Sequence, residues 1–145
     1  MKYPLTVEII TPEKVAYKGT AEYLSLPAYN GSLGVLPGHI DYLTMLNPGE
    51  IRIKKDDDWQ LFAVSGGFAE IHPHNVVILC ETAESAEEID IERAELTKQR
   101  AKEKLEKVGA DLSAQSSQIE AQIQIAAARL KVVSDLKKRK KKRIA

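Results

Sequence analysis

The stretch Asn30-Gly31-Ser32-Leu33-Gly34-Val35-Leu36-Pro37-Gly38-His39 decides how the first half of the chain can fold. Its three glycines and one proline exclude a helix, because glycine is entropically costly there and proline lacks the N–H donor. We therefore expect Gly34-Val35-Leu36 to form a short buried strand between two tight bends. A second glycine cluster, Val64-Ser65-Gly66-Gly67-Phe68, lies among alternating apolar residues and predicts another bend.

The residues before position 82 form short apolar segments separated by turn residues, which is typical of β-strands. The segment Tyr23-Leu24-Ser25-Leu26 is expected to end at Pro27, because proline cannot donate a ladder hydrogen bond. A parallel sheet would need helical crossovers, and none separates these segments. We therefore expect an all-β sandwich or barrel of about nine to ten short strands. The expected strands are Leu5–Ile9, Val15–Tyr17, Tyr23–Leu26, Gly34–Leu36, Tyr42–Leu46, Ile51–Lys54, Trp59–Val64, Phe68–His72 and Asn75–Cys80.

From Ile89 the pattern becomes that of an antiparallel two-helix hairpin, which follows an acidic linker over residues 82–88. Asp90 suits a helix N-cap, and Ser117-Gln118-Ile119-Glu120 fits a capping box, although the second helix could begin as early as Ser113. The fold class is therefore α+β, with a β-sandwich over residues 1–85 and a helical hairpin over residues 86–145. The two apolar stripes are Ala94, Ala101, Leu105 and Val108, and Ile119, Ile123, Ala126, Leu130 and Val133.

Alanine is prominent in both stripes, and a buried alanine contributes less than the about 1.5–3 kcal/mol of a buried leucine. The hairpin is therefore expected to separate easily, as a conformational switch would. A marginal helical appendage with no switching role has the same appearance.

The net charge of zero conceals a division between the two halves of the chain. Residues 1–89 carry 6 Lys and Arg against 13 Asp and Glu, whereas residues 90–145 carry 15 against 8. The basic half favours an acidic partner, and its last turn, residues 137–143, is expected to fray because seven adjacent cations repel one another. This run could meet an acidic protein face, an anionic membrane or nucleic acid, or it could be a solvated tail. The absence of interleaved aromatics weakens the nucleic-acid alternative.

The sequence contains neither a membrane-spanning run of roughly 18 apolar residues nor the start of a signal peptide. It also contains no phosphate-cradling motif and no nucleophile elbow, so we expect no catalysis by this chain. His72-Pro73-His74 could form a metal clip with Cys80, but a turn between strands explains it better. Cys80 is then a small buried core residue, and no metal is expected.

Asp90, Arg93, Thr97 and Arg100 share one helical face, and Arg129 would approach that face if the hairpin closes. Converging guanidinium groups would suit a polyphosphate, and a nearby carboxylate could accept from an adenine amino group. An ordinary surface ion pair between Asp90 and Arg93 is the simpler explanation on spacing alone.

Several motifs, taken in order along nearly the whole chain, resemble those of the epsilon subunit of bacterial and chloroplast rotary ATP synthases, which translocate protons or sodium ions. That family has an N-terminal β-sandwich and a C-terminal helical hairpin. The matching motifs are Gly34-Val35-Leu36-Pro37-Gly38-His39, Leu43-Thr44, Pro48-Gly49, Ile51-Arg52, Val64-Ser65-Gly66-Gly67-Phe68, Ala83-Glu84 and Ile89-Asp90-Ile91-Glu92-Arg93-Ala94.

The resemblance implies a non-catalytic central-stalk subunit that couples rotation of the c-ring to the catalytic head. The implied partners are the gamma subunit, the c-ring and the alpha/beta catalytic head, with no nucleic acid and no membrane span. The implied location is peripheral, at the cytoplasmic face of the bacterial membrane or the stromal face of the thylakoid in a plastid. Docking on gamma and the c-ring is implied for the bends at Gly31, Ser32, Pro37, Gly38 and His39.

The resemblance also implies that the hairpin regulates ATP hydrolysis. The compact hairpin permits turnover, and the extended hairpin enters the catalytic head and blocks hydrolysis. A second helix from Ser113 to Arg139 would span roughly 40 Å, which is long enough to reach. The implied inhibitory contacts with the beta subunits come from Arg129, Lys131, Lys137 and Lys138.

Some relatives bind ATP on the closed hairpin through an Ile-Asp-x-x-Arg-Ala motif. Here Ile89, Asp90, Arg93 and Ala94 match that motif, and Ile125 stands where those relatives carry another arginine, which weakens or removes the site. No cofactor is required, and regulatory MgATP is the expected candidate ligand. A free-standing ATP-responsive or nucleic-acid-binding module is the alternative from a different class. The other residues that align with the ATP-binding relatives are Glu84, Arg100 and Arg129.

Overall fold

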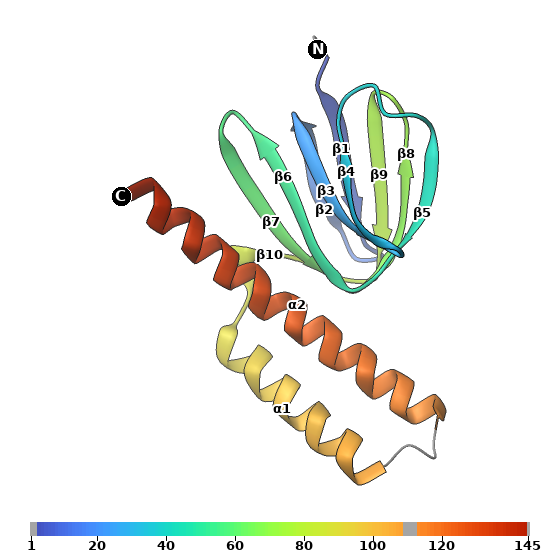
Figure 1. The fold of residues 1–145 in the computed structure, drawn as a ribbon, viewed down its shortest axis with the longest axis vertical. Helices are drawn as coiled ribbons and strands as arrows, with labels where there is room; N and C mark the ends of the chain where they lie inside the picture. The colour runs from blue at the N-terminus through green and yellow to red at the C-terminus, as the bar shows by residue number, and fades with distance from the viewer. Residues whose placement is uncertain (1–2, 109–112, 145) are drawn as a thin grey trace.

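The computed structural model describes residues 3–108 and 113–144, in which ten strands precede a short 3₁₀ helix and two α-helices (Figure 1). The predicted order of strands followed by a helical hairpin is confirmed. The elements are β1 (Leu5–Ile10), β2 (Val15–Ala21), β3 (Tyr23–Ala28), β4 (Gly31–Val35), β5 (Tyr42–Leu46), β6 (Gly49–Lys55), β7 (Asp58–Val64), β8 (Gly67–Ile71), β9 (Asn75–Cys80), β10 (Ala83–Ser85), η1 (Ala86–Glu88), α1 (Ile91–Val108) and α2 (Ser113–Ile144).

The strands form two packed layers. One layer has the order β10-β7-β6-β3-β4 and the other β5-β8-β9-β1-β2, and the pair Ala28–Leu46 joins them. Alternate residues point inward, so that Leu5, Val7 and Ile9 of β1 are fully buried in the core between the layers. The predicted sandwich is therefore confirmed.

The strand β1 lies parallel to β9, whereas we expected no parallel pairing. The crossover that such a pair needs is here supplied by the intervening strands, and no helix is required.

Three predicted boundaries in the sandwich were wrong. The strand β4 begins at Gly31, and Leu36 lies outside it with 58% of its surface exposed. The strand β3 continues through Pro27, whose carbonyl accepts a hydrogen bond from the Asn47 N–H over 2.9 Å. Pro27 therefore contributes an acceptor at a place where the missing donor is not needed. The segment expected to be a linker, residues 82–88, contains β10, which pairs with β7, and η1.

Two glycine bends behave as the sequence indicated. Gly38 has a φ of 89°, and its N–H donates to the Pro73 carbonyl over 2.8 Å. Gly67 has a φ of 145°, and any Cβ there would collide with the carbonyl of Leu79 on β9. Glycine is required at this second bend because it alone combines a positive φ with so close an approach of two strands.

The two helices begin and end differently from the prediction. Asp90 caps α1 as expected, since its Oδ1 accepts the Arg93 N–H over 3.2 Å. The helix α2, however, starts at Ser113 and not at Ser117, and it continues through the basic run to Ile144 without fraying. The predicted break at Gly109 lies outside the described residues. None of the described helical segments is long and apolar enough to cross a bilayer.

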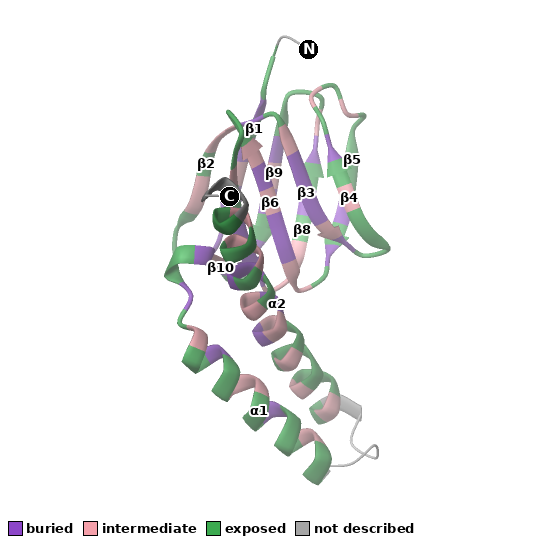
Figure 2. Cartoon of the chain, turned by 60° about the vertical axis from the view of Figure 1, so that its left-hand side comes forward, coloured by how far each residue is buried: buried purple, intermediate pink, exposed green. Residues whose placement is uncertain are grey.

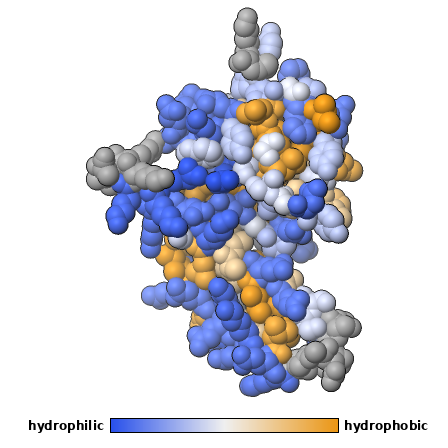
Figure 3. Space-filling model, in the orientation of Figure 1, coloured by the Kyte–Doolittle hydropathy of each residue, from blue (hydrophilic) through white to orange (hydrophobic). Residues whose placement is uncertain are grey.

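The helix α2 packs on the outer face of β7, and α1 packs on α2 away from the sandwich (Figures 1 and 2). Leu61 and Ala63 of β7 contact the cluster that contains Ala128 and Val132 of α2. Phe62 and Val64 of the same strand face the sandwich core, so all four residues of this run are buried. Figure 3 shows the hydrophobic stripe that runs between the two helices. The hairpin is therefore closed.

Candidate functional site

A pocket of about 380 Å³ lies where β10, α1 and α2 meet, and we call it the junction pocket. The strand β10 supplies Glu84, the start of α1 supplies Arg93, and α2 supplies Arg129. Arg100 does not line this pocket, because it lies two turns further along α1 and is exposed. Five of the six residues aligned with an ATP site are brought together here: Glu84, Asp90, Arg93, Ala94 and Arg129.

The first turn of α1 forms one wall of the junction pocket. The Asp90 carboxylate accepts the backbone N–H of Arg93, and the Asp90 carbonyl accepts the Ala94 N–H over 3.0 Å. Thr97 Oγ1 donates to the Arg93 carbonyl over 2.8 Å. Asp90 and Thr97 therefore fix the helix start, while the Arg93 side chain is exposed.

Arg129 forms the strongest printed contact of the pocket. Its Nε donates to Glu84 Oε1 over 2.6 Å, and the two side chains are 27% and 33% exposed. The pocket is also lined by the carboxylates of Glu88 and Asp90, so its acids outnumber its two guanidinium groups. These residues fit a nucleotide only in part: a carboxylate acceptor and the Arg93 fork are present, but the second fork is already engaged.

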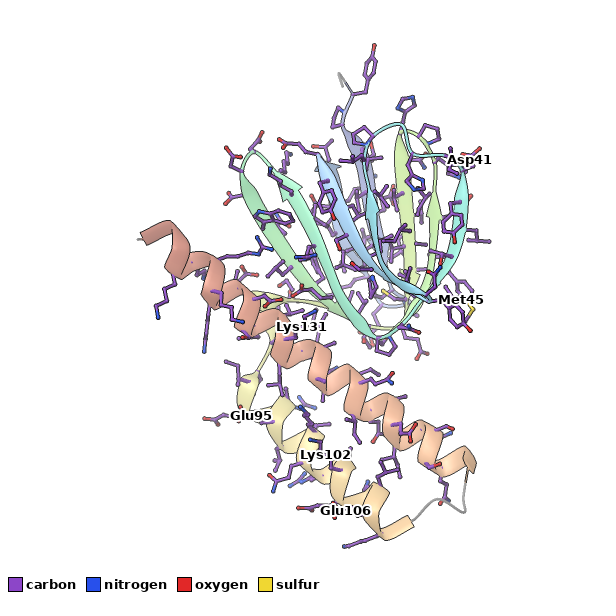
Figure 4. All side chains as sticks on the ribbon, in the orientation of Figure 1. Asp41, Met45, Glu95, Lys102, Glu106 and Lys131 are labelled. Carbon is purple, nitrogen blue, oxygen red and sulfur yellow. The ribbon has the colours of Figure 1, made fainter. Side chains whose placement is uncertain are left out.

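The docking residues predicted from the glycine-rich stretch lie at two opposite ends of the sandwich. Figure 4 labels Asp41 and Met45 at the two ends of β5, and Gly38 is near the Asp41 end, where it bonds to Pro73. Gly31 and Ser32 lie at the other end, beside Asn47 and α2. The two bends are therefore separate surfaces. Pro37 and His39 lie with Gly38 at the first end.

An apolar row that the sequence analysis missed crosses the outer face of the second layer. Its members pair from strand to strand over β5, β8, β9, β1 and β2. Four of them are more than half exposed, and the fifth is partly buried. A signal was present in Val76-Val77-Ile78-Leu79, since a strand with one solvated face alternates and this run does not. The outer row consists of Met45, Phe68, Leu79, Ile10 and Val15.

The basic residues expected to make inhibitory contacts do not form one free surface. Arg129 is bound to Glu84, and Lys131 lines a second pocket of about 470 Å³ between α2 and β6. Lys137 and Lys138 are exposed on the last turns of α2.

A buried carboxyl group lies in that second pocket. The Glu50 side chain is 4% exposed, its Oε1 is 3.6 Å from Arg52 Nε, and no described donor reaches its Oε2. Burial, together with a hydrogen bond to the Asp135 carboxyl, raises the pKa of Glu50 to about 7. Lys131 and Arg52 oppose this shift. A proton shared by Glu50 and Asp135 thus links the sandwich to α2.

The histidine and cysteine residues serve the sandwich. His72 lies at the β8–β9 turn and contacts Asp41 over 2.8 Å and Glu70 over 2.9 Å, and these two carboxylates raise its pKa. Cys80 is a core residue with 7% exposure, and burial raises the pKa of its thiol to about 11. The turn and the buried cysteine are confirmed. Among the described residues, no group of His, Cys, Asp and Glu is arranged to hold a metal ion.

Known proteins are similar to this chain over both of its parts. The model of the ATP synthase delta/epsilon chain β-sandwich domain matches residues 4–86, and that of the long α-helix domain of the same chain matches residues 87–134. The ATP synthase epsilon chain of Bacillus subtilis is 48% identical over 99 residues, which is 68% of this chain and 75% of that one. The epsilon chain of Bacillus licheniformis is 45% identical over 108 residues, or 74% and 82% of the two chains. A chain in the Euglena gracilis mitochondrial ATP synthase structure shares the fold, with a TM-score of 0.76 and 21% identity over 88% of this chain and 80% of that one.

Proposed function

The chain belongs to the epsilon-chain family of bacterial-type ATP synthases, and we propose that it is a rotor subunit that couples c-ring rotation to the catalytic head. In this role it has no catalytic residues of its own. It binds peripherally at the cytoplasmic face of the membrane, through the gamma subunit and the c-ring.

The observation that carries this proposal is the outer row. Met45, Phe68 and Leu79 are 54%, 51% and 53% exposed and lie side by side on three strands. Contiguous apolar surface of this kind marks a protein–protein interface on a water-soluble domain. The gamma subunit is the partner that covers it, and the bends at Gly31-Ser32 and at Pro37-Gly38-His39 serve the contacts at the two ends of the sandwich.

Regulation by the hairpin is the second part of the proposal. The helix α2 rests on the sandwich through small side chains such as Ala128 and Val132, whose burial contributes less than that of leucine. A helix held this way can leave the sandwich and extend toward the catalytic head. Extended, it inhibits ATP hydrolysis through Arg129, Lys131, Lys137 and Lys138.

The junction pocket is the place where regulatory MgATP would act. Glu84 supplies an acceptor for the adenine amino group, and Arg93 supplies a fork donor for phosphate. Arg129 joins them only by exchanging its bond to Glu84 for one to the ligand. A ligand that binds only the closed hairpin stabilises it by about 2.7 kcal/mol at a hundredfold excess over Kd.

The docking role is tested by isolating the tagged full-length chain from its own cells. Wild type is expected to carry the gamma subunit and the catalytic head with it, whereas the double variant Met45→Lys/Leu79→Lys is expected to lose them, because two cations would be buried at the interface. Leu96→Lys is the matched control, since Leu96 is an exposed apolar residue of α1 with 47% exposure. Retention of gamma by the double variant would overturn the assignment of the outer row. A wild-type chain isolated alone would favour the free-standing module.

A further inference from the structure

The last turns of α2 contact the tip of the β6–β7 hairpin. The Arg139 guanidinium lies 4.2 Å from the centroid of the Trp59 ring. Residues 135–144 of α2 lie beyond the part of the chain that the family models match, which ends at residue 134. The contact is therefore a property of this chain that family membership alone does not provide.

The surroundings of this contact are acidic. Arg139 and Lys140 line a pocket together with Asp57, Asp58 and Glu87, and we call this group of three acids around Trp59 the acidic notch. Figure 3 shows the hydrophilic surface that extends over the β6–β7 hairpin and the adjoining part of α2. The carboxylates offset the repulsion among the basic side chains, which explains why α2 stays helical where isolated cations would fray.

Trp59 is held in place from the sandwich side. Its ring meets the ring of Tyr23 edge-on, with 6.0 Å between centroids. Arg139 covers the same indole from the helix side, so the tryptophan is sandwiched between β3 and α2. A cation over a fixed indole contributes about 0.5–1 kcal/mol at exposed sites.

The sequence of the β6–β7 turn retains acids at positions where the backbone favours other residues. Asp56 and Asp57 have φ values of 52° and 63°, which is the geometry that Asn-Gly adopts most readily in a two-residue hairpin. This cost is consistent with a role for the negative charge.

We propose that the basic end of α2, residues 137–141, is a salt-sensitive latch that holds the hairpin closed by docking Arg139 on Trp59 in the acidic notch. The helix leaves the sandwich only after this contact opens. Cations in the acidic notch are unavailable to any other acidic surface, so the latch also withholds them while the hairpin is closed. The proposal goes beyond the proposed function, because it requires no other subunit, and its failure would leave the rotor assignment intact.

The test uses the full-length chain with Cys80→Ala and Ala128→Cys. Ala128 is 6% exposed at the contact between α2 and the sandwich, so the rate at which the introduced thiol reacts with a maleimide reports opening of the hairpin. Trp59 is the single tryptophan of the chain, and its emission reports the state of the acidic notch. Both signals are recorded from about 0.05 to about 1 M NaCl, where screening becomes strong.

Arg139→Gln is expected to raise the labelling rate roughly two- to fivefold at low salt, which is the loss of one cation–π contact expressed as an opening equilibrium. Wild type is expected to approach the same rate as salt rises. The matched control is Arg100→Gln, which removes the same charge from an exposed position of α1 and leaves the rate unchanged. An altered Trp59 emission with an unchanged labelling rate would overturn the latch, because the contact would then be local. A wild-type rate independent of salt would also overturn it.

Discussion

Arg129 on α2 donates its Nε–H to Glu84 on β10 over 2.6 Å, so a single ion pair ties the helical hairpin to the last strand of the sandwich. Both side chains are partly buried, which makes the pair stronger than an exposed one. The arginine aligned with a phosphate ligand therefore already has an acidic partner. Any anionic ligand of the junction pocket must compete with Glu84.

The first prediction concerns MgATP. We expect Glu84→Gln to bind MgATP at least about threefold more tightly than wild type, because the amide keeps an acceptor for adenine and no longer attracts the Arg129 charge. Arg93→Ala is expected to abolish binding, since it removes the exposed fork donor. Isothermal titration calorimetry of the isolated chain measures both effects. If wild type and Glu84→Gln both fail to bind at millimolar MgATP, the junction pocket is not a nucleotide site.

The second prediction concerns pH. The pKa of Glu50 is raised to about 7 when α2 is docked, whereas a solvated glutamate has an ordinary value of 4.5. Docking therefore takes up a proton between these two values, so its stabilising effect is complete below pH 4.5 and is lost as the pH rises through 7. The closed hairpin is expected to open more readily at pH 8 than at pH 6. The thiol introduced by Ala128→Cys measures this opening, compared at each pH with the reactivity of a small free thiol.

Glu50→Gln provides the control for the pH effect. The glutamine is neutral at every pH and can donate to Asp135, so the variant is expected to stay closed at pH 8. Glu81→Gln changes an exposed carboxylate between β9 and β10 and is expected to behave like wild type. An equal pH dependence in Glu50→Gln and wild type would show that the carboxyl pair does not control docking.

The third prediction concerns the bend at Gly67. Gly67→Ala is expected to lower the free energy of unfolding by about 3 kcal/mol, because the added Cβ meets the Leu79 carbonyl in a strained backbone conformation. Gly31→Ala is the matched control: Gly31 also has a positive φ, of 130°, but nothing lies within 4 Å of its Cβ position. It is expected to cost about 1 kcal/mol. Urea unfolding measures both, and equal costs would mean that the collision is relieved by strand movement.

Local signals predicted the parts of this fold that local chemistry determines. The bends at Gly38 and Gly67 require a positive φ, and the Asp90 cap needs only the next three residues. Docking of the hairpin was not predicted because it depends on a long-range contact. Its signal was the run Leu61-Phe62-Ala63-Val64, which is apolar at both parities because one side meets the core and the other meets α2.

The second apolar face of α2 was missed for a related reason. Ala128, Val132 and Leu136 recur at intervals of four, next to the stripe that faces α1, and their small side chains give a weak pattern. The expected fraying of the basic end was wrong because Arg139 meets Trp59, a residue 80 positions earlier in the sequence. The alignment of Glu84 and Arg129 with a nucleotide site located the junction pocket, but only the structure reveals that they bind each other.

The most direct measurement is ATP hydrolysis by the assembled ATP synthase containing either the full chain or a chain ending at Glu88. Gamma must be retained in both preparations, which confirms that the sandwich has docked. If the hairpin is the inhibitory element, the complex with the shortened chain hydrolyses ATP faster than the complex with the full chain. Equal rates with gamma retained would contradict regulation by the hairpin and leave the chain with a coupling role alone.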